Sequence, residues 1–202
     1  RNIEFVSLDE ARANKHRIDW EANPPVKPLR TGTFSLNKFP LEEIVPYINW
    51  MFFFVTWELR GKFPEILSNP KYGTEAQKLY DDALDLLKLI VEEKWITANA
   101  VYGIYPANTE EDDIIIYEDE TRTTESTRFI NLRNQTKKDE PLANLCLSDF
   151  VAPRSSGIND YVGAFAVTAG IGIEERIKEF EKDHDDYSSM MIKALTDRLA
   201  EA

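Results

Sequence analysis

The clearest hydrophobic periodicity in the chain lies between residues 74 and 93. Thr74 and Gln77 have the spacing of a capping box, in which two side chains satisfy the free N–H groups of a first helical turn. Apolar side chains then recur every three or four residues, at Leu79, Tyr80, Ala83, Leu87, Ile90 and Val91. Acidic residues occupy the other faces. The pattern predicts an amphipathic helix with one buried stripe.

A second amphipathic face begins near Ile173 and continues to the last residues. Its positions recur at helical spacing, at Ile173, Ile177, Phe180, His184, Tyr187, Met191 and Leu195. The spacing predicts one long helix. Because no Gly, Asn or Pro follows Leu199 to end it, we expect the chain to be truncated inside this last helix of a longer protein.

Between these helical regions the periodicity changes to that of strands. Short runs rich in β-branched and aromatic residues occur at Val101–Tyr105, Ile114–Tyr117, Arg128–Leu132, Leu147–Val151 and Tyr161–Thr168. Strands in the middle of the chain with helices towards both ends favour the α+β class over regular βαβ alternation. The sequence therefore predicts a mostly antiparallel sheet flanked by helices.

Aromatic residues concentrate between residues 39 and 63, at Phe39, Tyr47, Trp50, Phe52, Phe53, Phe54, Trp57 and Phe63. Pro40 suits the first turn of a helix, whereas Pro46 should break or kink the same segment. The run Trp50–Trp57 is apolar on every side, so we expect a helix that is buried all round.

Residues 1–30 are polar and lack a regular pattern. Three prolines between Asn23 and Pro28 exclude a regular helix or a central strand there. Two interpretations are open for residues 1–15: an arm laid over the body, or a disordered linker to an upstream domain. After residue 15 the arm is favoured, anchored by Ile18 and Trp20. We thus divide the chain into an arm or linker over 1–30 and a domain over 31–202.

Charge and cysteine content narrow the class of protein. The chain has 24 Lys and Arg against 36 Asp and Glu, a formal net charge of −12, and 43% of it is hydrophobic. This composition is typical of a globular protein and argues against a general binder of nucleic acid or anionic membranes. No apolar run is long enough to span a membrane, and Cys146 is the single cysteine. A cytoplasmic location is expected.

The common catalytic motifs are absent from the sequence. Gly170-Ile171-Gly172 would need a third glycine at position 175 for a dinucleotide fingerprint, but that residue is Glu175. A strand-to-helix turn that needs a permissive backbone is the favoured interpretation. Cys146 has only His16 and His184 as imidazole partners, both distant in sequence, so we expect a small core residue rather than a nucleophile.

Acidic and aromatic residues supply the other candidate chemistry. The acidic clusters at 110–113, 118–120 and 185–186 lack the spacing of a calcium loop, which favours solvated charge and no metal site. His184 lies on an apolar stripe, where a core histidine is favoured over a ligand. The aromatic segment could line a groove for a cationic or heteroaromatic ligand, although burial in the core is the favoured alternative.

Five blocks of sequence resemble a known family. They are Tyr47–Leu67, then Gly103–Asn108 with Asp112–Ile114 and Asp119–Arg122, then Leu147–Pro153, then Asp160–Thr168, and finally His184–Tyr187 with Lys193–Ala202. In this order they resemble the activation domain of cobalamin-dependent methionine synthase, across roughly residues 17–202.

The resemblance implies a C-shaped single domain around a twisted, mostly antiparallel sheet. It implies the C-terminal module of a cytoplasmic methyltransferase that makes methionine from homocysteine and methyltetrahydrofolate with cobalamin. In this family the module docks on the cobalamin-binding module when cobalamin has oxidised to cob(II)alamin. It presents S-adenosylmethionine there, while flavodoxin or a related flavoprotein reductase supplies an electron. The 202-residue fragment alone is not expected to be catalytic.

The resemblance implies that two residues of this chain contact the ligand. Asn49 occupies the place where the family commonly has an aspartate that contacts S-adenosylmethionine, and Glu201 matches a glutamate near the same ligand. An amide at position 49 keeps hydrogen bonding but loses Coulombic attraction for a cation. The family's Arg-x-x-x-Gly-Tyr motif lies beyond the last helix, so we expect this fragment to bind S-adenosylmethionine weakly or not at all.

Two alternative functions compete with this expectation. One is a docking-only structural domain that lost S-adenosylmethionine binding together with the aspartate at position 49. The other is a free-standing hydrolase or oxidoreductase that uses acidic residues such as Asp112 and Asp185, for which the motif support is weak.

Overall fold

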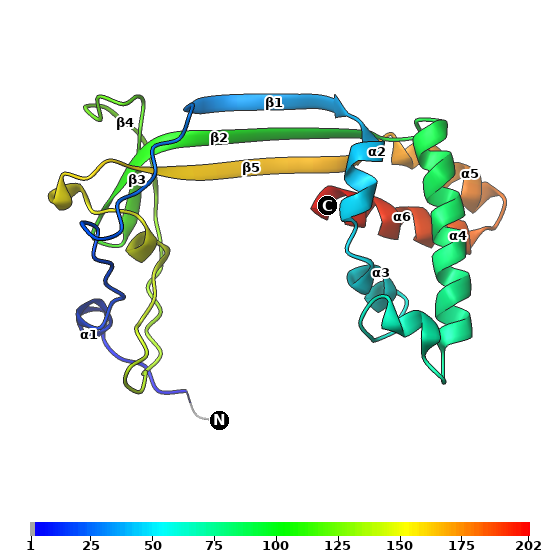
Figure 1. The fold of residues 1–202 in the computed structure, drawn as a ribbon, viewed down its shortest axis with the longest axis horizontal. Helices are drawn as coiled ribbons and strands as arrows, with labels where there is room; N and C mark the ends of the chain where they lie inside the picture. The colour runs from blue at the N-terminus through cyan, green and yellow to red at the C-terminus, as the bar shows by residue number, and fades with distance from the viewer. Residues whose placement is uncertain (1–2) are drawn as a thin grey trace. The chain divides into compact units, whose positions relative to one another are not determined.

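The computed structural model describes residues 3–202 and divides them into two compact units (Figure 1). Unit 1 is built from the described part of Arg1–Phe34 and from Tyr102–Ala164, and unit 2 from Ser35–Val101 and Phe165–Ala202. The chain passes from one unit to the other within three of its strands. In residues 3–202 no helix is both long and apolar enough to cross a membrane.

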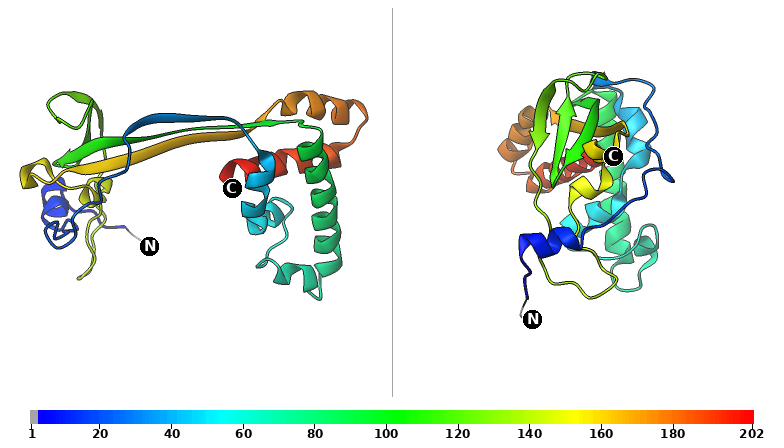
Figure 2. Two further views of the ribbon diagram at one scale, coloured as in Figure 1. Left: turned by 45° about the horizontal axis from the view of Figure 1, so that its top comes forward. Right: turned by 90° about the vertical axis from the view of Figure 1, so that its left-hand side faces the viewer.

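The sheet has five strands. They are β1 (Gly32–Phe39), β2 (Thr97–Glu110), β3 (Asp113–Tyr117), β4 (Glu125–Phe129) and β5 (Asp160–Ile171). Their order is β1-β2-β3-β4, and β5 also pairs with β2. β3 runs antiparallel to both β2 and β4, as the green strands in the right-hand view of Figure 2 show. The predicted α+β class with antiparallel pairing is therefore confirmed.

The helices of unit 2 surround its hydrophobic core. They are α2 (Leu41–Ile44), α3 (Trp50–Thr56), α4 (Gly73–Glu92), α5 (Ile173–Lys182) and α6 (Asp186–Glu201), with 3₁₀ turns η1 (Val45–Tyr47) and η2 (Glu65–Ser68). α4 confirms the predicted amphipathic helix and buries Ala76, Leu79, Ala83, Leu87 and Ile90. The predicted capping box is wrong, because the helix already begins at Gly73 and Tyr72 is its N-cap residue.

The predicted long C-terminal helix is wrong, since it is two helices. His184 has a φ of 57°, in the left-handed region that a helix cannot continue through. The Asp185 side chain then accepts a hydrogen bond from the Ser188 N–H and caps the start of α6. His184 consequently lies in an exposed turn, and the expectation of a core histidine is also wrong.

The aromatic helix α3 is buried on one side only. Phe53 and Phe54 are fully buried, whereas Phe52 and Val55 are 47% and 48% exposed. The expectation of burial all round is wrong because α3 has only seven residues and packs on the core with one face. The predicted break at Pro46 is confirmed, since α2 ends at Ile44 and a 3₁₀ turn follows.

Unit 1 differs from the prediction at Leu147–Val151. Most of this run, expected as a strand, forms a 3₁₀ turn, η3 (Leu147–Phe150), in which Asp149 accepts a hydrogen bond from the Cys146 N–H. A second 3₁₀ turn, η4 (Arg154–Ser156), follows. The N-terminal segment contains a short helix, α1 (Leu8–Ala13), which begins at a capping box made by Ser7 and Glu10.

The turn between β5 and α5 confirms the structural interpretation of the glycine pair. Gly172 is the N-cap residue of α5 and has a φ of 101°, which L-residues with a Cβ rarely adopt. A Cβ there would lie 2.9 Å from the carbonyl oxygen of Trp95, whereas a Cβ on Gly170 would meet only the Thr196 Cβ at 3.8 Å. The first glycine of the pair is thus replaceable and the second is not.

Gly172→Ala is therefore expected to lower the free energy of unfolding by about 1–3 kcal/mol, because it adds backbone strain and a close contact. Urea denaturation of the purified protein measures this loss. Gly170→Ala is the matched control and should stay within about 1 kcal/mol of the wild type. Equal losses in the two variants would contradict the conclusion that the turn requires glycine at position 172 but not at position 170.

Candidate functional site

Asn49 lies at the N-terminus of α3 and is exposed. Its side-chain oxygen accepts a hydrogen bond of 3.2 Å from the backbone N–H of Met51, which satisfies one free donor of the first turn. The preceding residue, Ile48, is buried in the core of unit 2 and anchors the turn. A carboxylate at position 49 could make the same cap and would add a negative charge at the helix N-terminus.

Glu201 is the last residue of α6. Both of its carboxylate oxygens accept hydrogen bonds from Arg198, Oε2 from Nη1 at 2.7 Å and Oε1 from Nη2 at 2.9 Å. The Arg198 side chain is only 13% exposed, whereas that of Glu201 is 60% exposed. The carboxylate is thus held by a largely buried arginine side chain and is itself exposed to solvent.

One contact connects the helices that carry these two residues. The guanidinium carbon of Arg198 lies 5.7 Å from the centre of the Phe52 ring on α3, and α3 packs against α6. Phe52 is three residues after Asn49, and Arg198 is three residues before Glu201. The structure therefore brings the two predicted elements together in unit 2. Within residues 3–202 it shows no hydrogen bond between the Asn49 and Glu201 side chains themselves.

A groove of about 410 Å³ lies beside these elements in unit 2. Its lining is mainly apolar, from Leu36, Phe39, Ile44, Tyr47, Ala98, Val167 and Leu199, with the polar groups of Glu43 and Asn99. Tyr47 is two residues before Asn49, and the lining residues Ala200 and Ala202 are the chain neighbours of Glu201. Apolar walls with a few polar groups are typical of sites for small organic molecules.

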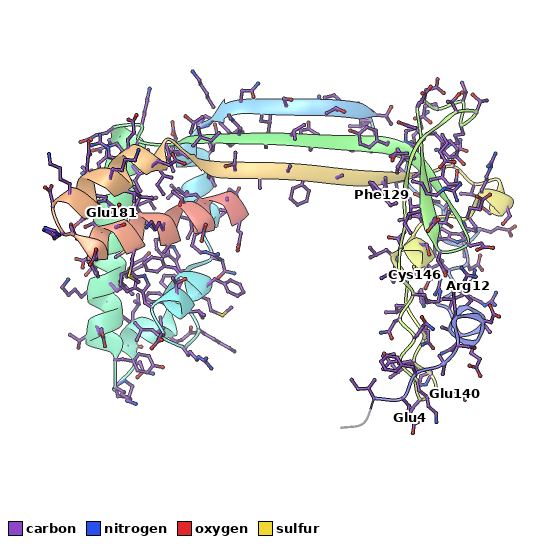
Figure 3. The ribbon with its side chains drawn as sticks, turned by 180° about the vertical axis from the view of Figure 1, so that it is seen from behind. Glu4, Arg12, Phe129, Glu140, Cys146 and Glu181 are labelled. Atoms are coloured by element: carbon purple, nitrogen blue, oxygen red, sulfur yellow. The ribbon has the colours of Figure 1, made fainter. Side chains whose placement is uncertain are left out.

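Two acidic residues of unit 1, Asp112 and Asp149, belong to a cluster of ion pairs with arginines. Arg133 is buried and donates hydrogen bonds to Asp112 at 2.7 Å and to Asp149 at 2.7 Å. Arg12 extends from α1 (Figure 3) and donates a hydrogen bond of 2.8 Å to Asp112. Burial raises the pKa of Asp112, but the hydrogen bonds from Arg12 and Arg133 outweigh it, so the net pKa lies below the ordinary value.

These contacts hold Asp112 and Asp149 in ion pairs with arginines. In the part of the chain from residue 3 onwards, no three His, Cys, Asp or Glu side chains are arranged to hold a metal ion. Cys146 is buried, with its thiol 3.6 Å from the carbonyl oxygen of Asp112 (Figure 3). His16 stacks on the Phe150 ring at 5.5 Å. The cysteine therefore takes the small-core-residue role that the sequence predicts.

Tyr187 belongs to the block His184–Tyr187, one of the segments that resemble the family. Its hydroxyl donates a hydrogen bond of 2.7 Å to Asp82 on α4, and burial together with this bond raises the pKa of Tyr187 to about 12. Lys78 donates to the same Asp82 carboxylate and lowers its pKa. The block therefore joins α6 to α4.

The chain matches a known protein family and a solved structure. The family described as "Vitamin B12 dependent methionine synthase, activation domain" matches residues 40–202. Among solved structures, one described as the crystal structure of the MetH reactivation domain bound to AdoHcy is 46% identical, with a TM-score of 0.93. That match covers 98% of this chain but 60% of the solved one. The chain belongs to the family of activation domains of vitamin B12-dependent methionine synthases.

Proposed function

We propose that this chain is part of the reactivation module of a cobalamin-dependent methionine synthase, a cytoplasmic 5-methyltetrahydrofolate–homocysteine methyltransferase. In this proposal it positions S-adenosylmethionine for reductive methylation of inactive cob(II)alamin. The observation that carries the proposal is the 46% identical relative described as bound to AdoHcy, which matches 98% of this chain. S-adenosylhomocysteine is what S-adenosylmethionine becomes when it gives up its methyl group.

The proposed chemistry needs three participants. The methyl acceptor, cobalamin, is held by a neighbouring module of the same enzyme, and flavodoxin or a related flavoprotein reductase donates one electron to it. The sulfonium of S-adenosylmethionine then donates its methyl group. This chain acts by holding the donor in place, a contribution of proximity and orientation rather than of a nucleophile.

Within this chain we assign ligand contacts to Asn49 and Glu201. The exposed carboxylate of Glu201 attracts the positive groups of S-adenosylmethionine, and the Asn49 amide offers both a donor and an acceptor. The adjoining groove, with its apolar and aromatic walls, suits the adenosine part. Because the chain spans 60% of the solved relative, we propose that residues 31–202 form only part of the binding domain.

Calorimetric titration of the full-length protein with S-adenosylmethionine tests the proposal. We expect saturable binding at one site. The competing interpretation, a docking-only domain that has lost the ligand, predicts no binding heat at any concentration. A separate titration of residues 1–202 should give weaker binding than the full-length protein, since the proposed site is incomplete in it.

Asn49→Asp should tighten binding of S-adenosylmethionine to the full-length protein by about fivefold. A carboxylate near a cation in a solvent-exposed site contributes about 1 kcal/mol. The helix cap should be kept, because Asp and Asn cap about equally well. Calorimetry measures the change in affinity.

Asn69→Asp is the matched control for this substitution. The Asn69 side chain also accepts a hydrogen bond from the backbone two residues later, at 2.9 Å from Lys71. It lies outside the proposed site, so the affinity should not change. Unchanged affinity in Asn49→Asp as well would remove residue 49 from the ligand contacts.

A further inference from the structure

We propose that Arg198 is a positioning residue. It fixes the Glu201 carboxylate where α3 and α6 meet, and it weakens the attraction of that carboxylate for positive charge. The inference rests on the proposed function, because Glu201 is there a ligand contact. Three observations support it: the paired hydrogen bonds between Arg198 and Glu201, the unequal exposure of their side chains, and the contact of Arg198 with Phe52.

Two parallel N–H···O bonds of 2.7 and 2.9 Å, from Arg198 to Glu201, fix both the direction and the plane of the Glu201 carboxylate. A glutamate at the end of a helix would otherwise sample several rotamers, and holding one of them lowers the entropy lost on binding. Arg198 therefore presents Glu201 in a defined orientation.

Arg198 is itself held in place by a contact with α3. Its guanidinium lies near the face of the Phe52 ring, and its side chain is 13% exposed, so the neighbouring helix restricts it. Phe52 belongs to the same short helix that Asn49 caps. The Glu201 carboxylate is thus held in a fixed position relative to α3, the helix that Asn49 caps.

Arg198 offsets part of the charge of Glu201 at hydrogen-bond distance, so this carboxylate attracts a cation less strongly than a free carboxylate would. The pair should therefore discriminate less between the sulfonium of S-adenosylmethionine and the neutral thioether of S-adenosylhomocysteine than a free glutamate would. Removing the guanidinium charge should strengthen that discrimination.

The test measures the affinities of the full-length protein for both ligands by calorimetry. In Arg198→Gln we expect weaker binding of S-adenosylhomocysteine and a ratio of the two affinities that shifts about fivefold towards S-adenosylmethionine. Arg198→Lys keeps the charge but not the paired bonds, so both affinities should fall with the ratio unchanged. In a Glu201→Gln background, Arg198→Gln should no longer weaken binding of S-adenosylhomocysteine, because the orienting role of Arg198 acts through the Glu201 carboxylate.

Arg176→Gln is the matched control. Arg176 forms the same three-residue-spaced pair with Glu179, at 2.7 Å, and its guanidinium lies 4.4 Å from the Trp95 ring centre. It should change neither affinity. An unchanged ratio in Arg198→Gln overturns the inference while the proposed function stands. If the wild-type protein binds neither ligand, the proposed function fails and the inference fails with it.

Discussion

Replacing Arg133 by methionine is expected to lower the free energy of unfolding by about 3–5 kcal/mol, because two buried carboxylates lose their shared cation. The Arg133 side chain is 1% exposed, and it donates paired hydrogen bonds to Asp112 and to Asp149. It also donates to the carbonyl oxygen of Asn144 at 2.7 Å. Methionine can fill part of the volume but satisfies none of these acceptors. Urea denaturation followed by circular dichroism measures the loss.

Arg128→Met provides the control, since Arg128 also pairs with several acids but is more exposed. It contacts Glu110 at 3.0 Å and Glu125 at 2.9 Å. Ion pairs in contact with solvent contribute little, so the expected loss is below about 1 kcal/mol. A similar loss in both variants would mean that burial does not determine how much the Arg133 cluster contributes to the free energy of unfolding.

The same cluster should make the stability of the protein depend on acid pH. The pKa of Asp112 is lowered in the folded state, so its contribution is complete above the unfolded value of about 4. The contribution is then lost as the pH falls through the folded value. Arg133→Met should flatten this part of the pH profile of stability.

Phe54→Ala is expected to cost about 3–5 kcal/mol, the usual penalty for removing a fully buried aromatic ring. Phe54 is 0% exposed and packs against Phe53 at 5.6 Å and Phe63 at 6.3 Å between ring centres. The cavity would loosen the face by which α3 is attached to the core. Thermal denaturation of the purified variant measures the effect.

Val55→Ala, on the next residue of the same helix, is the matched control. Val55 is 48% exposed, so its truncation should cost no more than about 1 kcal/mol. Comparable losses at positions 54 and 55 would contradict the one-sided burial of α3.

The sequence predicts the parts of the fold that depend on local periodicity. The stripe of α4 and the β-branched runs of β3 and β5 were sufficient to place these elements and the α+β class. Local signals also existed for α1, whose Ser7 and Glu10 form a capping box that the polar composition of the segment obscures. The C-terminal periodicity led to the wrong prediction of one long helix, because the apolar stripe continues across the turn at His184.

The parts that could not be predicted depend on contacts distant in sequence. The half-exposure of α3 follows from how much of its surface the core covers, which an all-apolar sequence does not reveal. Asn49 and Glu201 came from family resemblance and not from the chemistry of the residues. Arg198 and Glu201 have visible helical spacing, but the contact of Arg198 with Phe52 depends on the packing of α6 against α3.

The most direct test of the proposed function is reactivation of the full-length enzyme. Its cobalamin is first oxidised to cob(II)alamin, and methylation is then followed by absorbance after addition of an electron donor and limiting S-adenosylmethionine. We expect the wild type to be methylated only when S-adenosylmethionine is present. The rate should fall about tenfold in Glu201→Gln, from loss of a charge-assisted contact, and stay near the wild-type rate in Glu181→Gln, an exposed glutamate on α5 (Figure 3). Methylation without S-adenosylmethionine, or equal rates in the two variants, would contradict the account.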